Sequence, residues 1–569
     1  MKKITLGNPE EFVPSKFCQT LNYKETEIKF PLESIHFKEY AGGCIVEFPV
    51  RPDESFFGFG LQLKGMNYKS RKVALRVNSD PVSNTGDSHA PVPFFVSSAG
   101  YGMYFDTARD IEFYCGFLPR HDRSGEISGS RDIAVSTDDL YAIRERDGIA
   151  VMSVRIPCAK GIDIYVFEGE KIVDIVSEYN MLAGGGPNVP EWGLGVLYRA
   201  YGRYSEKEII ELAKYFRDND IPCDIMGLEP GWQSGSYPCT FVWDSGRYPN
   251  YKGLIEYLKN NGFHINLWEH AYTHAASPIY TKLYEHSADY EVWSGIIPDF
   301  AVPEARKIFA DYHREYLVKE GIDGFKLDEC DNSDYANCYS YSHTANFPSG
   351  MDGEQYHHMM GTLYMQTIQD ALGDISTLSE VRNAGALCAP YPFVLYSDLY
   401  DHDDFIRGVV TSGFSGILWT PEVRAAKSKK DLIRRLQSNI FSVQCIINAW
   451  YFEGVPWSEF GCEDEVRELL KLRKALVPML KRAFDEYRDT GKPPVRALVC
   501  DYTDDSETYE IDNEYIFCDN LIVAPLTERS DTRNVYLPQG KWRNYFTKEP
   551  VNSGWFTVET DGIPVYEKC

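Results

Sequence analysis

Leu194-Gly-Val-Leu197, a helical pattern over residues 205–216 and Asp224-Ile-Met-Gly-Leu228 form the stretch that decides the fold. The two short apolar runs predict strands, and the segment between them has the spacing of an amphipathic helix. Ser205, with Glu208 three residues later, is a capping box that marks where this helix begins. The stretch therefore predicts one strand–helix–strand unit with parallel strands.

The same unit recurs from residue 191 to residue 455. Later helical patterns, each followed by an apolar run, cover residues 251–260 before 264–268, 303–320 before 324–327, and 359–372 before 376–379. A doubly wound open sheet would also repeat in this way, but no G-x-G-x-x-G sequence follows the first strand. The length and the repetition instead predict a (β/α)8 TIM barrel.

Sequence on either side of the barrel indicates two β-rich regions. Residues 1–188 contain short alternating runs separated by turn residues, which predicts an N-terminal β-sandwich ending in the Gly- and Pro-rich segment 184–190. We place the catalytic barrel at residues 189–458. Residues 459–569 contain a long helical pattern and then β-like runs, which predicts a helix plus a short C-terminal β-domain. The chain is thus expected to be multidomain, α/β and β.

Charge and composition exclude several classes of partner. A formal net charge of −26 would repel both nucleic acid and an anionic membrane surface. The first residues contain no apolar core region, so we expect no signal peptide, and no uncharged apolar run reaches membrane-spanning length. The 14 cysteines are scattered without a C-x-x-C pair, which favours reduced thiols and a cytoplasmic location. The His, Asp and Glu spacing suggests no metal site, and we expect no cofactor.

Carboxylates recur where the predicted strands end. In a barrel enzyme the active site lies at the carboxyl ends of the strands, so these side chains are expected to converge. Cleavage of a glycosidic bond requires one ionised and one protonated carboxyl group, and nearby cations such as Lys326 and Arg382 can separate their pKa values. The candidates are Glu229, Glu269, Asp328, Glu380, Asp398 and Glu422.

Several segments resemble glycoside hydrolase family 31, which contains α-glucosidases, α-xylosidases and α-galactosidases. The resemblance covers nearly the whole chain and rests on Phe56–Gly60, Pro91–Tyr104, Pro190–Gly195, Gly324–Asp331 and Asp519–Pro525. It implies a retaining exo-acting α-glycosidase that hydrolyses terminal α-linked sugars through a covalent glycosyl-enzyme. Its substrate would be a small oligosaccharide or glycoside, and a homo-oligomer is compatible with the sequence.

The resemblance also implies roles for particular residues. Lys326-Leu-Asp328 matches the family's nucleophile segment, which makes Asp328 the nucleophile and Lys326 a substrate or charge partner beside it. Asp398 follows Arg382 by the sixteen residues expected in the family, which makes Asp398 the general acid/base and Arg382 a ligand of a sugar hydroxyl. The rivals for the acid/base position are Asp401, Asp403 and Asp404.

Three segments depart from the family pattern, and all three concern sugar recognition. Trp419–Arg424 replaces an Asp-Ile-Gly-Gly-Phe segment, with Glu422 in the acidic place; Asn448–Glu453 replaces a His-bearing segment; and Glu229 stands where the family often has Asp. The sequence therefore leaves glucose, galactose and xylose open. Further candidates for substrate contact, for which core packing is at least as common an outcome, are Trp232, Trp268, Trp419, Trp450 and His270.

Two other outcomes remain open. A transglycosylase or a lyase would use the same covalent intermediate, and a non-catalytic carbohydrate-binding relative would be expected to lack one of the two carboxylates. A retaining mechanism predicts that the carboxyl groups of Asp328 and Asp398 lie about 5–5.5 Å apart, whereas an inverting mechanism requires about 6.5–9.5 Å.

Overall fold

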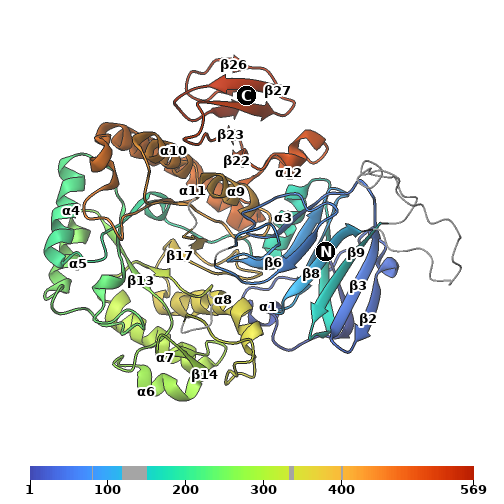
Figure 1. The fold of residues 1–569 in the computed structure, drawn as a ribbon, viewed down its shortest axis with the longest axis horizontal. Helices are drawn as coiled ribbons and strands as arrows, with labels where there is room; N and C mark the ends of the chain where they lie inside the picture. The colour runs from blue at the N-terminus through green and yellow to red at the C-terminus, as the bar shows by residue number, and fades with distance from the viewer. Residues whose placement is uncertain (80, 118–149, 332–338, 399–400) are drawn as a thin grey trace, which may run out of the picture.

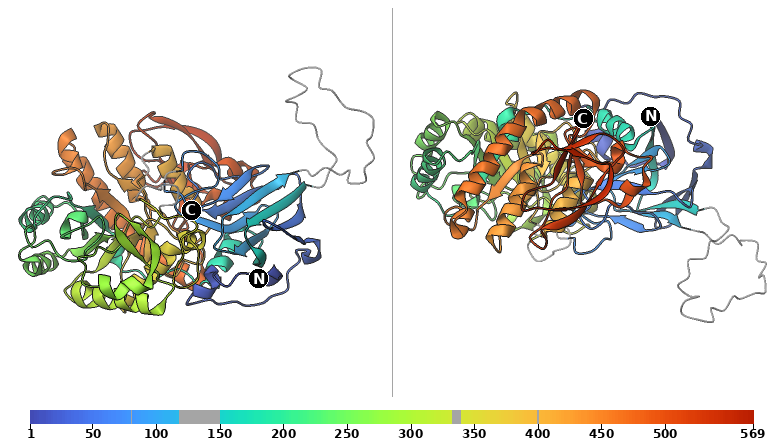
Figure 2. Two further views of the ribbon diagram at one scale, coloured as in Figure 1. Left: turned by 60° about the horizontal axis from the view of Figure 1, so that its bottom comes forward. Right: turned by 90° about the horizontal axis from the view of Figure 1, so that it is seen from above.

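The computed structural model describes residues 1–79, 81–117, 150–331, 339–398 and 401–569. It shows an N-terminal sandwich, a central barrel and a C-terminal β-region, with the sandwich beside the barrel (Figures 1 and 2). This arrangement confirms the predicted fold class. In the described residues, no helix is both long and apolar enough to span a membrane, and every described cysteine is free.

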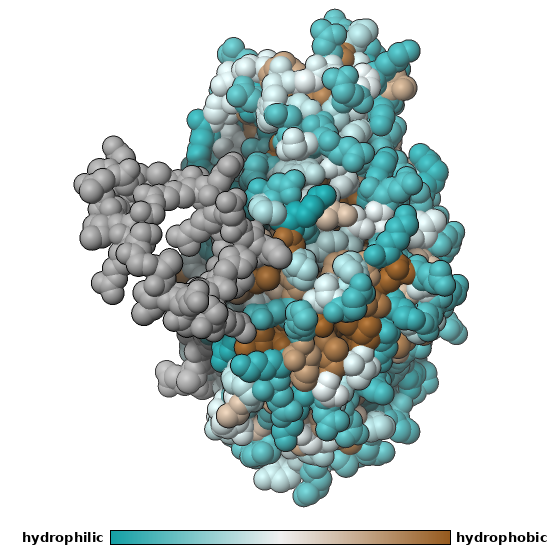
Figure 3. Space-filling model, turned by 90° about the vertical axis from the view of Figure 1, so that its right-hand side faces the viewer, coloured by the Kyte–Doolittle hydropathy of each residue, from teal (hydrophilic) through white to brown (hydrophobic). Residues whose placement is uncertain are grey.

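The N-terminal sandwich consists of two five-stranded antiparallel sheets. Their facing sides bury a shared apolar core that includes Phe48, Phe59, Phe95 and Phe113. One sheet has the order β1 (Lys2–Asn8), β10 (Lys160–Glu168), β7 (Tyr101–Asp106), β6 (Pro91–Ser97), β4 (Phe56–Gly60). The other has the order β2 (His36–Tyr40), β3 (Gly43–Val50), β9 (Ala150–Pro157), β8 (Ile111–Phe117), β5 (Lys72–Leu75). Figure 3 shows the surface at this end of the molecule, mostly hydrophilic with a band of hydrophobic residues.

The first sheet of the sandwich is covered on its other side as well. β6 and β7 are buried along their whole length, because helix α3 (Ile172–Leu182) packs against them. The ring of Phe94 in β6 stacks on that of Tyr179 in α3, with centroids 4.0 Å apart. This explains the nearly continuous apolar sequence of β6, since a strand buried on both faces has no polar alternation.

Eight parallel strands form the barrel. Their order is β18 (Phe393–Leu395), β17 (Ser379–Val381), β16 (Gly324–Leu327), β13 (His264–Glu269), β12 (Ile225–Leu228), β11 (Val196–Arg199), β20 (Cys445–Asn448), β19 (Glu422–Val423). A parallel bridge between Leu395 and Trp419 connects the two ends of this sheet. The helices around it are α4 (Glu206–Asp218), α5 (Tyr251–Asn260), α7 (Pro303–His313), α8 (Gly353–Leu372), α9 (His402–Ser412), α10 (Lys429–Ile440) and α11 (Glu463–Thr490).

Some element boundaries differ from the sequence predictions. The first barrel strand begins at Val196 rather than at residue 194, because residues 191–194 form a 3-10 turn, η2 (Glu191–Leu194). The strand expected at 376–379 lies at Ser379–Val381. Glu208 does cap the α4 N-terminus, because its carboxylate accepts from the Ser205 backbone N–H at 2.7 Å. Single turns at strand ends carry too little periodicity to be placed from sequence.

The C-terminal region joins the barrel through α11. Arg473 of α11 is fully buried, and its guanidinium donates to the backbone carbonyls of Leu194, Ile440, Ser442 and Val443. The β-region beyond has a six-stranded sheet, β21 (Val495–Ala497), β22 (Tyr515–Phe517), β23 (Leu521–Val523), β28 (Val565–Lys568), β25 (Trp542–Asn544), β26 (Pro550–Val551), and a pair, β24 (Thr532–Leu537) and β27 (Gly554–Glu559). α11 therefore fixes the closed end of the barrel, away from the carboxyl ends of its strands.

Candidate active site

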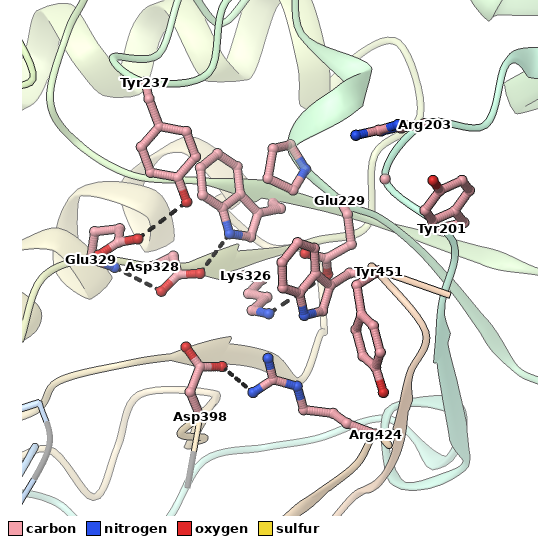
Figure 4. A pocket seen from close by; sticks show the side chains of 14 residues that line it. Tyr201, Arg203, Glu229, Tyr237, Lys326, Asp328, Glu329, Asp398, Arg424 and Tyr451 are labelled. Carbon is pink, nitrogen blue, oxygen red and sulfur yellow. Dashed lines mark hydrogen bonds and ion pairs between the residues drawn. The ribbon is translucent and has the colours of Figure 1, made fainter. Parts of the chain in front are cut away.

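A cavity of about 460 Å³ opens at the carboxyl ends of the barrel strands. Figure 4 shows its side chains, which come from β13 and β16 and from the segments that follow most of the barrel strands. The lining residues are Tyr201, Gly202, Arg203, Glu229, Pro230, Tyr237, Trp268, Lys326, Asp328, Glu329, Asp398, Arg424, Trp450 and Tyr451. Of the residues predicted from sequence, the cavity brings together Asp328, Asp398, Lys326, Glu229, Trp268 and Trp450.

Asp328 lies directly after β16 and is held by donors on both carboxylate oxygens. The Trp268 indole N–H donates to Oδ2 at 2.6 Å, and the Glu329 backbone N–H donates to Oδ1 at 2.8 Å. Arg382 adds a longer contact from Nη1 at 3.4 Å. Burial alone would raise the pKa of Asp328, but the charges of Arg382 and Lys326 outweigh burial and lower it. Asp328 is therefore an ionised carboxylate with a fixed orientation.

Asp398 follows β18 and is held by two guanidinium groups. Arg382 Nη1 lies 2.6 Å from Oδ2, and Arg424 Nη1 lies 2.6 Å from Oδ1. The Asp398 side chain is 44% exposed at the cavity mouth. Partial burial would raise its pKa, but Arg382 and Arg424 more than offset that effect and hold the pKa well below the usual range. Asp398 is thus ionised in this arrangement.

The contact that both carboxylates make with Arg382 sets a limit on their separation. Asp328 Oδ1 and Asp398 Oδ2 lie 3.4 Å and 2.6 Å from the same Nη1 atom, so these two oxygens cannot be more than about 6 Å apart. Arg382 is itself fixed, because its Nε donates to the buried carboxylate of Asp331 at 3.1 Å. This limit on the facing oxygens agrees with the separation of about 5–5.5 Å between the carboxyl groups of retaining enzymes.

The rivals of Asp398 point elsewhere. Asp401 caps α9 by accepting from the backbone N–H groups of Asp403 and Asp404. Asp403 pairs with Arg529 on the surface, and Asp404 pairs with Lys64 and Arg407. None of the three lines the cavity. Their helix-cap and surface roles explain why this stretch of sequence is so acidic.

A buried network of charges lies beneath the cavity. Arg199 is fully buried and pairs with Glu380 and with Glu229, the latter at 3.1 Å. The ammonium of Lys326 lies 3.6 Å from both Glu229 and Glu422, so its ion pairs go to these residues rather than to Asp328. Burial raises the pKa of Glu380 to about 7 despite Arg199. The network fixes Glu229 and Lys326 at the floor of the cavity.

Five residues predicted to contact substrate do not line the cavity. Arg382 and Glu422 lie behind it and act on Asp328, Asp398 and Lys326. Trp232 is fully buried and donates its indole N–H to the Trp268 carbonyl at 2.7 Å, so it supports Trp268 from below. The other two, Trp419 and His270, also lie outside the cavity lining, because a residue near a strand end can face the barrel wall.

Trp419 is part of that wall. Its backbone bridges to Leu395, and its ring packs on Phe405 of α9, with centroids 6.0 Å apart. His270 is fully buried among the rings of Tyr237, Trp268, Tyr272 and Trp293. Burial lowers the His270 pKa to about 3, so the imidazole is neutral. Both residues are structural.

Sequence reasoning missed part of the cavity lining. The missed side chains lie in loops without periodicity: Tyr201 and Arg203 after β11, Tyr237 before β13, Glu329 beside the Asp328 carboxylate, and Arg424 and Tyr451 in two of the three segments that depart from the family pattern. The sequence pointed to Arg424 and Tyr451 only through the segments that depart from the family pattern, because those segments mark where sugar recognition differs. Tyr237 donates to Glu329 at 3.1 Å, which ties the loop before β13 to the end of β16.

A group of possible metal ligands lies away from the cavity. In the described residues, His402, Asp431 and Glu528 bring their ligand atoms within 4.8 Å of one another. Arg435 lies in contact with Asp431, with its Nε 2.7 Å from Oδ1, and its positive charge disfavours a cation there. This trio supplies no group to the cavity, and the prediction that the chain uses no metal stays a prediction.

Comparison with protein families decides what this barrel is. Residues 186–483 match the model of the glycosyl hydrolases family 31 TIM-barrel domain, and residues 491–569 match that of the glycosyl hydrolase family 31 C-terminal domain. The chain belongs to glycoside hydrolase family 31. This membership confirms the resemblance drawn from the sequence and makes the chain a member of a family of glycoside hydrolases.

The family 31 relatives differ in substrate. Alpha-glucosidase 2 from Bacillus thermoamyloliquefaciens is 25% identical, covering 90% of this chain and 66% of the relative. An alpha-xylosidase from Emericella nidulans is 23% identical, covering 93% and 67%. The solved structure of a Flavobacterium johnsoniae dextranase in complex with glucose superposes with a TM-score of 0.79 at 23% identity, covering 94% and 67%. This chain therefore spans about two thirds of the length of these relatives.

Proposed function

We propose that the chain is a retaining, exo-acting α-glycosidase in which Asp328 is the nucleophile and Asp398 the general acid/base. The observation that carries the proposal is the shared contact of both carboxylates with Arg382 Nη1 at the carboxyl end of a barrel. Facing oxygens no more than about 6 Å apart fit the short spacing of retaining enzymes better than the wider spacing by which inverting enzymes admit a water molecule. Direct attack by Asp328 fits this geometry.

The proposed reaction has two displacements. Asp398 donates a proton to the glycosidic oxygen while Asp328 attacks the anomeric carbon, so the leaving group departs as an alcohol and a glycosyl ester forms. Asp398, now a carboxylate, takes a proton from water, and the water oxygen attacks the same carbon and releases Asp328. The Trp268 and Glu329 N–H groups orient the Asp328 carboxylate for both steps.

The cavity floor fits a terminal sugar. Glu229 and Lys326 offer an acceptor and a donor there, and the network of Arg199, Glu380 and Glu422 behind them closes the barrel interior. A closed floor favours an exo-acting enzyme over one that binds the middle of a chain. Glucose, galactose and xylose remain the candidate sugars, because they differ at single hydroxyl or hydroxymethyl groups that these side chains would contact.

Time-resolved proton NMR of hydrolysis tests the mechanism. A panel of 4-nitrophenyl α-D-glycosides identifies a cleaved substrate, and the first sugar product should then be the α-anomer, before mutarotation. Appearance of the β-anomer first would contradict retention, and no cleavage of any α-glycoside would contradict the function. Adding an acceptor sugar shows whether the covalent intermediate is transferred instead of hydrolysed, which would indicate a transglycosylase.

We also propose a cytoplasmic location. Its support is the set of free cysteines in the described residues, since reduced thiols persist in that compartment. Fractionation of the source cells with an antibody to the chain tests it, and recovery in an extracellular or periplasmic fraction would contradict it.

A further inference from the structure

Arg424 occupies the cavity wall beside the proposed acid. Its guanidinium contacts Asp398 at 2.6 Å (Figure 4). It also lies over the Trp450 ring, 6.0 Å from the centroid. Its Nε is 4.0 Å from Glu422. The Arg424 side chain is only 8% exposed, yet it lines the cavity, so a bound substrate would meet it directly.

This contact conflicts with the first chemical step. A general acid must carry a proton, but Asp398 lies between two guanidinium groups that favour its ionised form. Arginine does not lose its own proton in proteins, so one guanidinium must move away before Asp398 can be protonated. Arg382 is held by Asp331 and Asp328 as well. Arg424 lines the cavity and Arg382 does not, so Arg424 is the guanidinium that a group on the bound substrate can reach and draw away.

An anion is the chemical group that draws a guanidinium away from a carboxylate. A neutral hydroxyl offers a weaker acceptor, because it carries no net negative charge and cannot accept two parallel N–H bonds from the guanidinium as a carboxylate or phosphate does. The same cavity contains a second arginine, Arg203, for which the described residues provide no ion pair or hydrogen bond. Arg203 follows β11 and Arg424 follows β19, next to the aromatic residues Tyr201, Trp450 and Tyr451.

We propose that the glycoside this cavity accepts carries an anionic substituent, such as a carboxylate, sulfonate or phosphate, that pairs with Arg424. The pairing moves Arg424 off Asp398, so binding of the correct substrate creates the acid that cleaves it. Arg424 is then a specificity-determining residue. The inference rests on the proposed function, because it assumes that Asp398 acts as the acid.

Initial rates on matched substrates test the inference. The neutral arm contains the 4-nitrophenyl α-D-glucoside, galactoside and xyloside; the anionic arm contains the α-D-glucuronide, the α-D-glucoside 6-phosphate and the 6-deoxy-6-sulfo-α-D-glucoside. We expect kcat/KM for one anionic substrate to exceed that for every neutral one by at least tenfold. Arg424→Gln should lower this anionic-to-neutral ratio at least tenfold, whereas Arg529→Gln, outside the cavity, should leave it unchanged.

Binding to an inactive variant provides a second measurement that needs no turnover. Asp328→Asn should bind the preferred anionic glycoside at least tenfold more tightly than its neutral counterpart by calorimetry. Cleavage of neutral glycosides at equal or higher efficiency would overturn the inference and leave the proposed function standing. An equal loss of both activities in Arg424→Gln would show that Arg424 only positions Asp398 and would also overturn it. If neither the neutral nor the anionic glycosides are cleaved or bound, both the proposed function and this inference fail.

Discussion

The two carboxylates of the active site are held in different ways. Asp328 follows β16 in the barrel wall and accepts from the Trp268 indole and the Glu329 backbone, neither of which carries a charge. Asp398 is 44% exposed and is held by the ends of two long arginine side chains. The first arrangement is rigid. The second can rearrange at Arg424, because a guanidinium that ends a long side chain in the cavity wall moves more easily than a backbone or a buried indole.

This difference fits the two proposed roles. A nucleophile must be ionised and aimed before the substrate arrives, and an arrangement built on the barrel does this without any motion. An acid/base residue must gain and lose a proton in each cycle, so its partners have to change. The geometry therefore predicts that substitutions at Asp328 and at Asp398 reduce activity in different ways.

The largest effect is expected for Asp328→Asn. Removing the charge abolishes attack on the anomeric carbon, and we expect kcat to fall on the order of 10⁴-fold or more on every substrate that the enzyme cleaves. The matched control is Asp323→Asn, at the opposite end of β16, where the carboxylate accepts from the Ile265 backbone N–H at 3.0 Å. The control should lower the melting temperature and leave kcat within a few-fold. Unchanged activity in Asp328→Asn would exclude Asp328 as the nucleophile.

Asp398→Ala should show a loss that depends on the leaving group. Without an acid, glycosides with alkoxide leaving groups should lose about 10²–10⁴-fold in kcat/KM, whereas activated dinitrophenyl glycosides should lose far less. Azide should restore turnover and give a glycosyl azide, because a small anion can reach the vacated position. Asp403→Ala, which removes only a surface pair with Arg529, is the control. A uniform loss across leaving groups would instead favour a role in binding.

The same contrast explains what could be predicted from sequence. Asp328, Glu229 and Trp268 lie at strand ends in segments with clear βα periodicity, and the structure places all three in the cavity. The contacts of Asp398 with Arg424 join two segments that are 26 residues apart, and no periodicity predicts such a pairing. Trp419 and His270 lie outside the cavity lining, because sequence locates a strand end without specifying which way a side chain faces. Tertiary packing decides that direction.

Trp268→Phe tests how much the indole hydrogen bond lowers the pKa of Asp328. The change keeps the aromatic ring and removes the 2.6 Å hydrogen bond to the carboxylate, so we expect kcat to fall by roughly tenfold. Because that bond favours the ionised form, the pKa of Asp328 should rise, and the acidic limb of the pH–kcat/KM profile should move to higher pH. Trp243→Phe, whose indole N–H has no partner in the described residues, should leave the profile in place. An unmoved acidic limb in Trp268→Phe would assign the ionisation of Asp328 to Arg382 and Lys326 alone.

The smallest effect concerns a buried carboxylate far from the cavity. Glu514, in the C-terminal β-region, pairs with Arg533 at 2.8 Å, and burial raises its pKa to about 7 despite that arginine. Asp328 shows the opposite shift because both Arg382 and Lys326 act on it. Between pH 4.5 and about 7 the folded state therefore holds a proton on Glu514 that the unfolded chain releases. The contribution of Glu514 to the free energy of unfolding is fully present below pH 4.5 and is lost as the pH rises through about 7.

Glu514→Gln removes that dependence, because the amide stays neutral at every pH. The melting temperature of the variant relative to the parent should rise between pH 4.5 and 7 and then level off, by an amount equivalent to at most about 1–3 kcal/mol. Activity at neutral pH should not change, since Glu514 lies outside the cavity. A constant difference in melting temperature across this range would mean that Arg533 alone keeps Glu514 ionised. One neighbouring cation would then suffice to keep a buried carboxylate ionised. By the same reasoning, either Arg382 or Lys326 alone would keep Asp328 ionised.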